Sequence, residues 1–244
     1  EFIMLSGMLS IFFNHFLKIN PFISVLLVLI IVGLVSFILE ELTLRPFKNK
    51  PVLIKIIFTI GFSIFIRGLA MLIFWKEPGL RYEAPFIDTT IKFFGAVISL
   101  YDIFIIIISL FLFAIIFILM EITIIGKSMR ACAINLKASK IIGINVNLTL
   151  RLSFIISGLL GAVGGIIITP KLGMSYDAGV FWGIKGFTAA ILGGLDSGIS
   201  AIFGGLILGL LESFITGYGF NLSFGLIKSE YKDIIICLVL IVFL

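Results

Sequence analysis

Four charged residues stand inside apolar stretches of the sequence: Arg67, Lys185, Asp196 and Glu212. A charge in apolar surroundings is costly to bury, so each residue is a candidate for a polar pathway or for an ion pair between helices. For Arg67 and Asp196 the ion pair, or a side chain that extends to the polar boundary, is favoured. For Lys185 and Glu212, packing or pairing and pathway lining are equally supported.

Motifs for catalysis or metal binding do not emerge from the sequence. It has no Ser-His-Asp arrangement, no paired-carboxylate motif and no HExxH, and Cys132 and Cys237 lack metal-site spacing. The Gly-Lys-Ser triplet at 126–128 matches the end of a nucleotide-binding loop, but Glu121 stands where that loop needs glycine. We therefore expect a protein that is not an enzyme, needs no cofactor or metal, and relies on another subunit for ATP hydrolysis.

The composition is that of a membrane protein. Apolar residues make up 61% of the 244 positions and charged residues only 13%, against about 25% in soluble domains. Mean hydropathy is +1.29. The net charge of +5 is concentrated in two loops, which indicates membrane topology and not nucleic-acid binding. We expect one transmembrane domain over 1–244, and we interpret the sequence as a fragment of a longer chain at both ends.

Apolar runs near 20 residues repeat along the chain, which is the signal of transmembrane helices. The expected helical segments are 2–13, 22–39, 51–75, 103–125, 147–169, 181–195, 199–216 and 230–244. Asn147 is expected to cap the fifth segment and Pro170 to end it, while 93–100 is expected to lie on the membrane interface. Segment 181–195 is short for a full span, so a tilted helix and a re-entrant half-helix both remain open.

A basic segment at 127–143 interrupts the apolar runs. Ser128 is expected as its N-cap and Gly143 as its terminating residue, with one helix of about 20 Å between them. This length is shorter than the hydrocarbon core, and Arg130 and Lys137 are accompanied by no acid, so the segment should lie beside the membrane. It either only sets topology or forms a rigid docking helix for a cytoplasmic partner, and spacing alone favours the first.

Glycine is concentrated in the second half, where 18 of 25 glycines lie between 143 and 225. Many recur at four-residue spacing, which places small residues on one helix face and lets backbones approach closely. Such contacts also let helices pivot at little steric cost. The predicted packing positions are Gly161, Gly165, Gly194, Gly205 and Gly209.

Three sequence blocks in one order carry a family resemblance: RACAINLKASKIIGIN, GGLDSGISAIFGGLILGLLES and EYKD. They resemble the permease subunits of branched-chain amino-acid ABC importers, over nearly the whole chain and most strongly from 129 to 233. The resemblance implies an all-α, polytopic transmembrane helix bundle of the ABC importer permease type. The chain departs from the family at Ile134 and Asn135, where an acidic pair is usual, and at Ser139, where alanine is usual.

The resemblance implies that the segment near 128–143 is a coupling helix on an ATP-binding subunit. The residues that it assigns to coupling are Arg130, Ala131, Asn135, Lys137 and Gly143. It further implies a second permease subunit and a periplasmic or extracytoplasmic substrate-binding protein, around a multi-pass protein of the cytoplasmic (inner) membrane of a bacterium or archaeon. The expected function is ATP-driven import of branched-chain or related amino acids by alternating access.

Two alternatives belong to other classes. One is a secondary carrier or channel for a small polar solute without an ATPase partner, and the other is a membrane scaffold without transport. A carrier has no need of a stiff docking helix, so the basic segment discriminates between the first alternative and the importer. The substrate and the homomeric or heteromeric nature of the permease pair stay open.

Loop charges predict the orientation in the lipid bilayer. Segment 45–55 holds four basic residues and 127–151 holds five with no acid, whereas 76–102 is near neutral. Because basic loops stay in the cytoplasm, 44–50 and 127–143 are expected inside and 76–100 outside.

Overall fold

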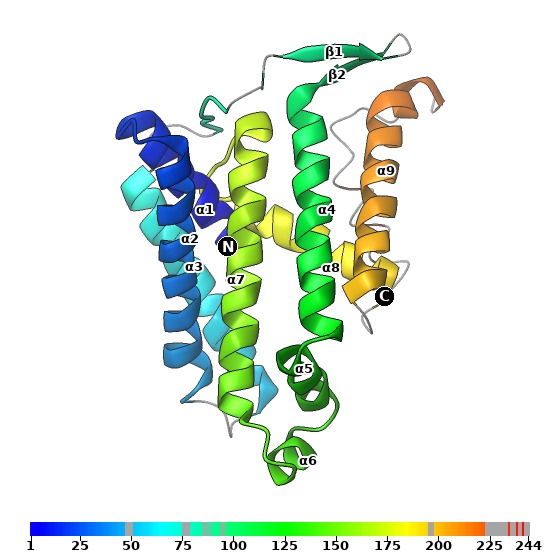
Figure 1. Ribbon diagram of the computed structural model, residues 1–244. Coiled ribbons are helices and arrows are strands. Elements are labelled where there is room, and N and C mark those ends of the chain that lie inside the picture. Colours follow the sequence, from blue (N-terminus) through cyan, green and yellow to red (C-terminus); the bar gives the residue numbers. More distant parts are fainter. Residues whose placement is uncertain are drawn as a thin grey trace. The chain divides into compact units, whose positions relative to one another are not determined.

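The computed structural model describes residues 1–46, 51–74, 79–84, 87, 89–93, 96–194, 198–222, 234, 238 and 241. Most of these residues are helical, which confirms the predicted all-α class (Figure 1). The helices are α1 (Phe2–Ile11), α2 (Pro21–Leu39), α3 (Val52–Phe74), α4 (Leu100–Glu121), α5 (Ile124–Ile134), α6 (Leu136–Ile141), α7 (Val146–Leu172), α8 (Ala178–Gly193) and α9 (Gly198–Leu222). Two π-helical turns, η1 (Phe12–Phe16) and η2 (Glu40–Leu44), extend α1 and α2.

Five described helices are long and apolar enough to cross a membrane. These segments are Pro21–Leu42, Leu53–Ile73, Leu100–Glu121, Val146–Leu172 and Ser200–Gly217. Each overlaps a predicted span. Helix α8 has 16 residues, about 24 Å of helix, and is short for a 30 Å hydrocarbon core, as its sequence indicated. The predicted final segment 230–244 lies almost entirely outside the described residues.

The chain forms two compact units, Glu1–Gly179 and Val180–Leu244. In the first unit α7 packs against α1 and α2. Val28 and Val32 of α2 are buried against Ala162 and Ile166 of α7, because a stripe of small and β-branched residues lets these helices lie close together. A second buried cluster joins α1 to α3. Apolar side chains point outward elsewhere, as expected of helices that face lipid.

A short hairpin precedes α4. Strands β1 (Thr90–Phe93) and β2 (Ala96–Ser99) pair antiparallel, with Thr90 opposite Ser99. Ser99 also caps α4, because its side chain accepts a hydrogen bond from the backbone N–H of Tyr101. In the segment expected on the interface, Ala96–Ser99 is a strand whose last residue caps α4. Figure 1 shows the hairpin at the end of α4 opposite to α5.

Both predicted ends of α7 were wrong. Asn145, and not Asn147, is the N-cap, and its side-chain oxygen accepts from the N–H of Leu148 at 3.2 Å. Pro170 lies inside the last turn, and the helix continues to Leu172 before Gly173, which has a φ of +75°.

The helix tolerates Pro170 because other donors satisfy the carbonyls near it. Proline has no N–H for the carbonyl four residues earlier, that of Ile166. The Tyr82 hydroxyl donates to this oxygen at 2.9 Å, and the Tyr101 hydroxyl donates to the carbonyl of Ile167 at 2.8 Å. Burial raises the pKa of Tyr82, so its hydroxyl keeps the proton that it donates.

Candidate functional site

The basic segment folds as two helices, α5 and α6, at the end of the first unit opposite to the hairpin (Figure 1). Helix α5 begins after Thr123, whose side chain accepts from the N–H of Gly126 at 3.2 Å. The predicted cap Ser128 lies inside the helix and donates to the carbonyl of Ile124. At Gly126 a Cβ would overlap backbone atoms of Met120, so the sharp corner after α4 requires glycine.

Asn135 divides the predicted single helix into two. Its backbone is extended, with φ −153° and ψ 102°, and its side-chain oxygen accepts from the N–H groups of Lys137 and Ala138 at 3.0 and 3.1 Å. The single-helix prediction was wrong because an asparagine side chain competes for backbone donors and favours the cap position. Gly143 does terminate the second helix, with a φ of +90°.

The surface of α5 and α6 combines basic and apolar side chains. Ile134 is 87% exposed and Ile141 is 86% exposed, beside the exposed Lys137, while Cys132 and Ser139 are buried. Arg130 is engaged within the chain, because its guanidinium lies 2.5 Å from a carboxylate oxygen of Glu121 at the end of α4. Ala131 is half-buried. The exposed set can therefore take a partner surface that is partly acidic and partly apolar.

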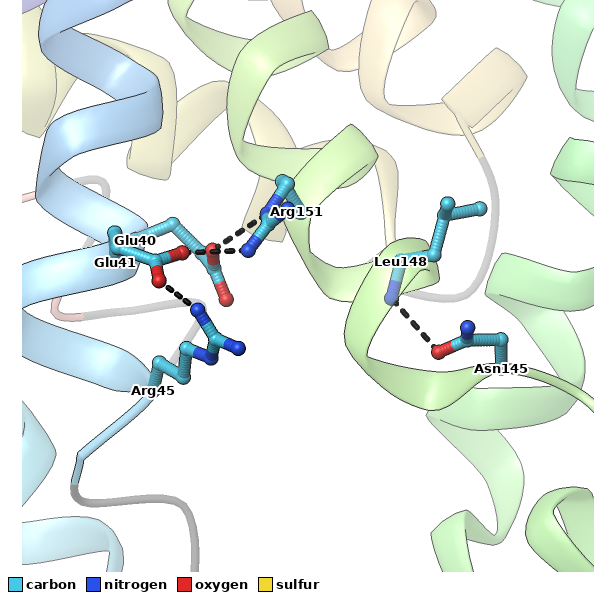
Figure 2. Close-up of polar contacts among 6 residues, drawn as sticks. All are labelled: Glu40, Glu41, Arg45, Asn145, Leu148 and Arg151. Atoms are coloured by element: carbon cyan, nitrogen blue, oxygen red, sulfur yellow. Dashed lines mark hydrogen bonds and ion pairs between the residues drawn. The ribbon is translucent and has the colours of Figure 1, made fainter.

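Figure 2 shows an ion-pair network that joins the first turns of α7 to η2. Arg151 Nε lies 3.3 Å from Glu40 Oε2, and Arg151 Nη2 lies 2.5 Å from Glu41 Oε2. Glu41 also pairs with Arg45, and the Arg151 guanidinium stacks 4.9 Å from the centre of the Phe37 ring. The Glu40 side chain is only 5% exposed, so this charge depends on its partner.

The network was not anticipated, because its members are about 110 positions apart and show no joint spacing. It places Arg45 at the same end of the unit as α5 and α6, which α7 contacts. The two basic loops therefore share one end, as predicted for the described part of the first loop. Lys48 and Lys50 lie outside the described residues.

The charged residues of the apolar stretches form ion pairs where they are described. Lys185 Nζ lies 2.8 Å from Glu212 Oε1 and 5.5 Å from the centre of the Trp182 ring, within the second unit. Arg67 Nη2 lies 2.9 Å from Glu1 Oε1, within the first. Of the two outcomes favoured for Arg67, an ion pair and a side chain that extends to the polar boundary, the structure shows the ion pair. Asp196 lies outside the described residues.

Two of the predicted packing glycines lie where α7 meets α1. A Cβ at Gly161 would stand 2.9 Å from Phe2 Cβ. A Cβ at Gly165 would overlap Ser6 Oγ and the carbonyl of Ile3. At both positions glycine lets the helices approach to backbone contact.

The other three predicted glycines do not make such contacts with described residues. Gly194 has a φ of +89° and serves the turn after α8. A Cβ at Gly205 would make only an ordinary contact with Ala189 Cβ at 3.8 Å, and one at Gly209 would meet nothing within 4 Å. Helices α8 and α9 approach closely at Gly193 and Gly204, each one position before a predicted packing glycine.

These features define a polytopic membrane protein in which the short helices α5 and α6 form a corner, the α5–α6 corner, at one end of the first unit. The sequence profile of the family "Branched-chain amino acid transport system / permease component" matches residues 1–244. The chain belongs to this family of permease components.

Curated relatives agree with this assignment. The high-affinity branched-chain amino acid permease protein LivH of Salmonella typhimurium is 31% identical over 85% of this chain and 66% of its own length. BraD of Pseudomonas aeruginosa is 33% identical with the same coverage of both chains, and a probable LivH of Methanocaldococcus jannaschii is 29% identical over 81% and 64%. The chain thus spans slightly less than two thirds of these relatives. No solved structure matches.

Proposed function

We propose that this chain is the membrane-spanning permease subunit of an ATP-driven importer for branched-chain or related amino acids. The observation that carries the proposal is the α5–α6 corner in a chain of this family. Both helices are capped by side chains, and they present exposed basic and isoleucine side chains away from the bundle. The expected location is the cytoplasmic (inner) membrane of a bacterium or archaeon, with α5 and α6 inside.

A force on this corner reaches three spans. Helix α5 follows α4 through the constrained Gly126, and α6 leads through Gly143 into α7. Arg151 of α7 then holds Glu40 and Glu41 at the end of α2. Because these links are covalent or are partly buried ion pairs, closure of ATP-binding subunits would tilt α4, α7 and α2 together, as alternating access requires.

The proposed coupling residues have two roles, direct contact with the ATP-binding subunit and positioning of α5 and α6. Lys137 faces outward with Ile134 and provides direct contact to the ATP-binding subunit. Arg130 acts through its pair with Glu121, which holds α5 against α4. Asn135 and Gly143 fix the angles at which α6 begins and ends, and Ala131 supports the half-buried side of α5.

The proposed assembly also contains a second permease subunit and an extracytoplasmic substrate-binding protein that delivers the solute. The names of the relatives support the transport system and its amino-acid class. A secondary carrier remains the alternative function, but nothing in a carrier would require the capped α5–α6 corner.

Assembly and ATP-driven uptake test the proposal. The full-length protein is coexpressed with the ATP-binding subunits and binding protein of its own organism, purified through a tag, and reconstituted into vesicles. We expect stoichiometric copurification of the ATP-binding subunits and uptake of tritiated leucine that stops when ATP is replaced by a non-hydrolysable analogue. Uptake that persists without the ATP-binding subunits would support the carrier instead.

A further inference from the structure

A cavity opens at the end of the first unit opposite to α5 and α6. This hairpin-end cavity encloses about 1170 Å³ and is lined by the turn between η1 and α2, the segment before the hairpin, and the last turn of α7. Its volume slightly exceeds the roughly 300–1,000 Å³ of small-molecule sites. The cavity can therefore take a group much larger than a bare ion.

The lining of the cavity is basic. Lys18 and Arg81 are exposed and make no ion pair with described residues. Lys171, the third cation of the lining, pairs with an aspartate of α4, and the lining also holds Glu83. With His15 neutral, these groups together carry a net charge of +1. The cavity therefore favours an anion with a single charge.

Hydrogen bonds hold the segments that carry the two unpaired cations. The Asn14 side chain donates to a serine hydroxyl of α2 at 2.8 Å, which fixes the turn that contains Lys18. The carbonyl of Leu80 accepts from the backbone after α7 at 3.1 Å, and the Tyr82 hydroxyl donates to a carbonyl of α7 at 2.9 Å. Both neighbours of Arg81 are thus anchored, so the cations are positioned before a ligand arrives.

The cavity lies at the boundary of the hydrocarbon core. Its lining includes Pro21, the first residue of one span, and Pro170 and Lys171, near the last residue of another. Lipid head groups occupy the layer just outside the hydrocarbon core. Adjacent to lining residues in the chain, Phe16 is 57% exposed and Phe22 is 87% exposed, as aromatic side chains at this interface often are.

We propose that the hairpin-end cavity binds the head group of an anionic glycerophospholipid such as phosphatidylglycerol. Lys18 and Arg81 donate to the phosphate oxygens, because ammonium and guanidinium groups both bind phosphate. The single negative charge of the phosphodiester matches the net charge of the cavity, and the acyl chains lie along Phe16 and Phe22. A soluble anion or an acidic protein surface would use the cations but would leave Phe22, inside the span, uncovered.

Lipid selectivity of the unmodified protein is the first test. The full-length permease in mild detergent is titrated by native mass spectrometry with phosphatidylglycerol and with phosphatidylethanolamine of the same acyl chains. We expect one phosphatidylglycerol to bind at least fivefold more tightly than phosphatidylethanolamine. Glycerophosphoglycerol, the same head group without acyl chains, should bind at least tenfold more weakly than the lipid. Equal affinities for the two lipids, or for the lipid and the free head group, would overturn the proposal.

Variants of exposed side chains locate the site. Lys18→Gln and Arg81→Gln should each weaken phosphatidylglycerol binding about fivefold, the usual contribution of one cation beside an anionic lipid surface. Lys92→Gln is the matched control, because Lys92 is an exposed cation of β1 outside the cavity lining, and its affinity should stay within twofold of the parent. Unchanged affinity in the two cavity variants, or an equal loss in the control, would also refute the assignment.

An acidic protein surface is the competing occupant. Affinity for the extracytoplasmic binding protein is measured with the same variants in phosphatidylethanolamine nanodiscs, and we expect it to stay within twofold of the parent. Variants that lose this affinity but still bind phosphatidylglycerol like the parent would assign the cavity to the binding protein and reject the lipid site.

Discussion

Glycines set the distance between α1 and α7 residue by residue. Gly165 sits against Ser6 Oγ and the carbonyl of Ile3, whereas an added Cβ at Gly164, one position earlier, would have no neighbour within 4 Å among the described residues. Sequence spacing placed Gly165 in a small-residue row, but it does not say which glycines have backbone pressed against them. That difference comes only from the packed helices.

Adding a single methyl group, by substitution with alanine, should therefore change stability differently at Gly165 and Gly164. Gly165→Ala forces α1 away from α7 and should lower the free energy of unfolding by roughly 1–3 kcal/mol, the usual cost of overpacking. Gly164→Ala meets open space and should be neutral or stabilising by up to about 1 kcal/mol, since alanine favours helix. Thermal unfolding of the purified protein in detergent compares them, and equal melting temperatures would mean that this contact does not form.

Arg151 should contribute more to the free energy of unfolding than the exposed Arg45 in the same network. Arg151→Met leaves the buried Glu40 unpaired and should cost about 3–5 kcal/mol of stability. Arg45, 54% exposed, should cost at most about 1 kcal/mol when changed to methionine. Adding Glu40→Gln to Arg151→Met should recover most of the loss. A double variant as unstable as Arg151→Met would place the defect elsewhere, for instance in the contact with Phe37.

At the scale of elements, the α5–α6 corner depends on where the helices begin and end. Leu136 is the first residue of α6, directly after the cap Asn135, whose backbone is extended. Proline suits the first position of a helix, and the residue before proline prefers extended backbone. A proline at Leu136 therefore does not break this structure, although it would break an uninterrupted helix.

Two proline variants test whether the corner must be rigid. Ala133→Pro lies inside α5 with an exposed side chain, so it removes a helical hydrogen bond and costs roughly 3 kcal/mol or more without altering side-chain packing. We expect it to reach the membrane but to lose copurification with the ATP-binding subunits and leucine uptake. Leu136→Pro, the control, should retain both within about twofold. Normal uptake by Ala133→Pro would remove the argument for a force-bearing corner.

Local patterns predicted the long elements and missed the short ones for physical reasons. Apolar runs located α2, α3, α4 and α9, because hydrocarbon imposes both composition and length on a span. The break at Asn135 and the passage of α7 through Pro170 depend on which donors and acceptors lie nearby. The Tyr82 hydroxyl that satisfies the carbonyl of Ile166 lies 84 positions away and is invisible to local spacing.

At the scale of the whole molecule, loop charge and geometry agree that the two basic loops lie at one end of the first unit. Arg45 and α6 adjoin the same end of the first unit, and Glu83 lies in the segment between α3 and the hairpin. The distant pairing of Glu1 with Arg67 could not be predicted beyond the general expectation of a partner. Which helices pack against each other depends on contacts between residues far apart in the sequence, and composition does not reveal these contacts.

Cysteine labelling tests the orientation directly. In a background with Cys132 and Cys237 replaced by serine, we place single cysteines at Lys140 and at Glu83, both on described loops or short helices. An impermeant maleimide added to intact cells should label Glu83→Cys and leave Lys140→Cys unlabelled until the membrane is opened. Labelling of Lys140→Cys first would invert the topology and with it the proposed docking side.

The two tyrosines beside Pro170 have a consequence for hydration. Without the hydroxyls of Tyr82 and Tyr101, the carbonyls of Ile166 and Ile167 would have to draw water into this end of the bundle, since lipid offers no donor. The last turns of α7 around Pro170 are thus kept dry by side chains from the segment before the hairpin and from the start of α4. Displacement of the segment that holds Tyr82 would therefore let water reach these carbonyls along α7. The two tyrosine hydrogen bonds thus exclude water from this region and also keep the helix continuous through Pro170.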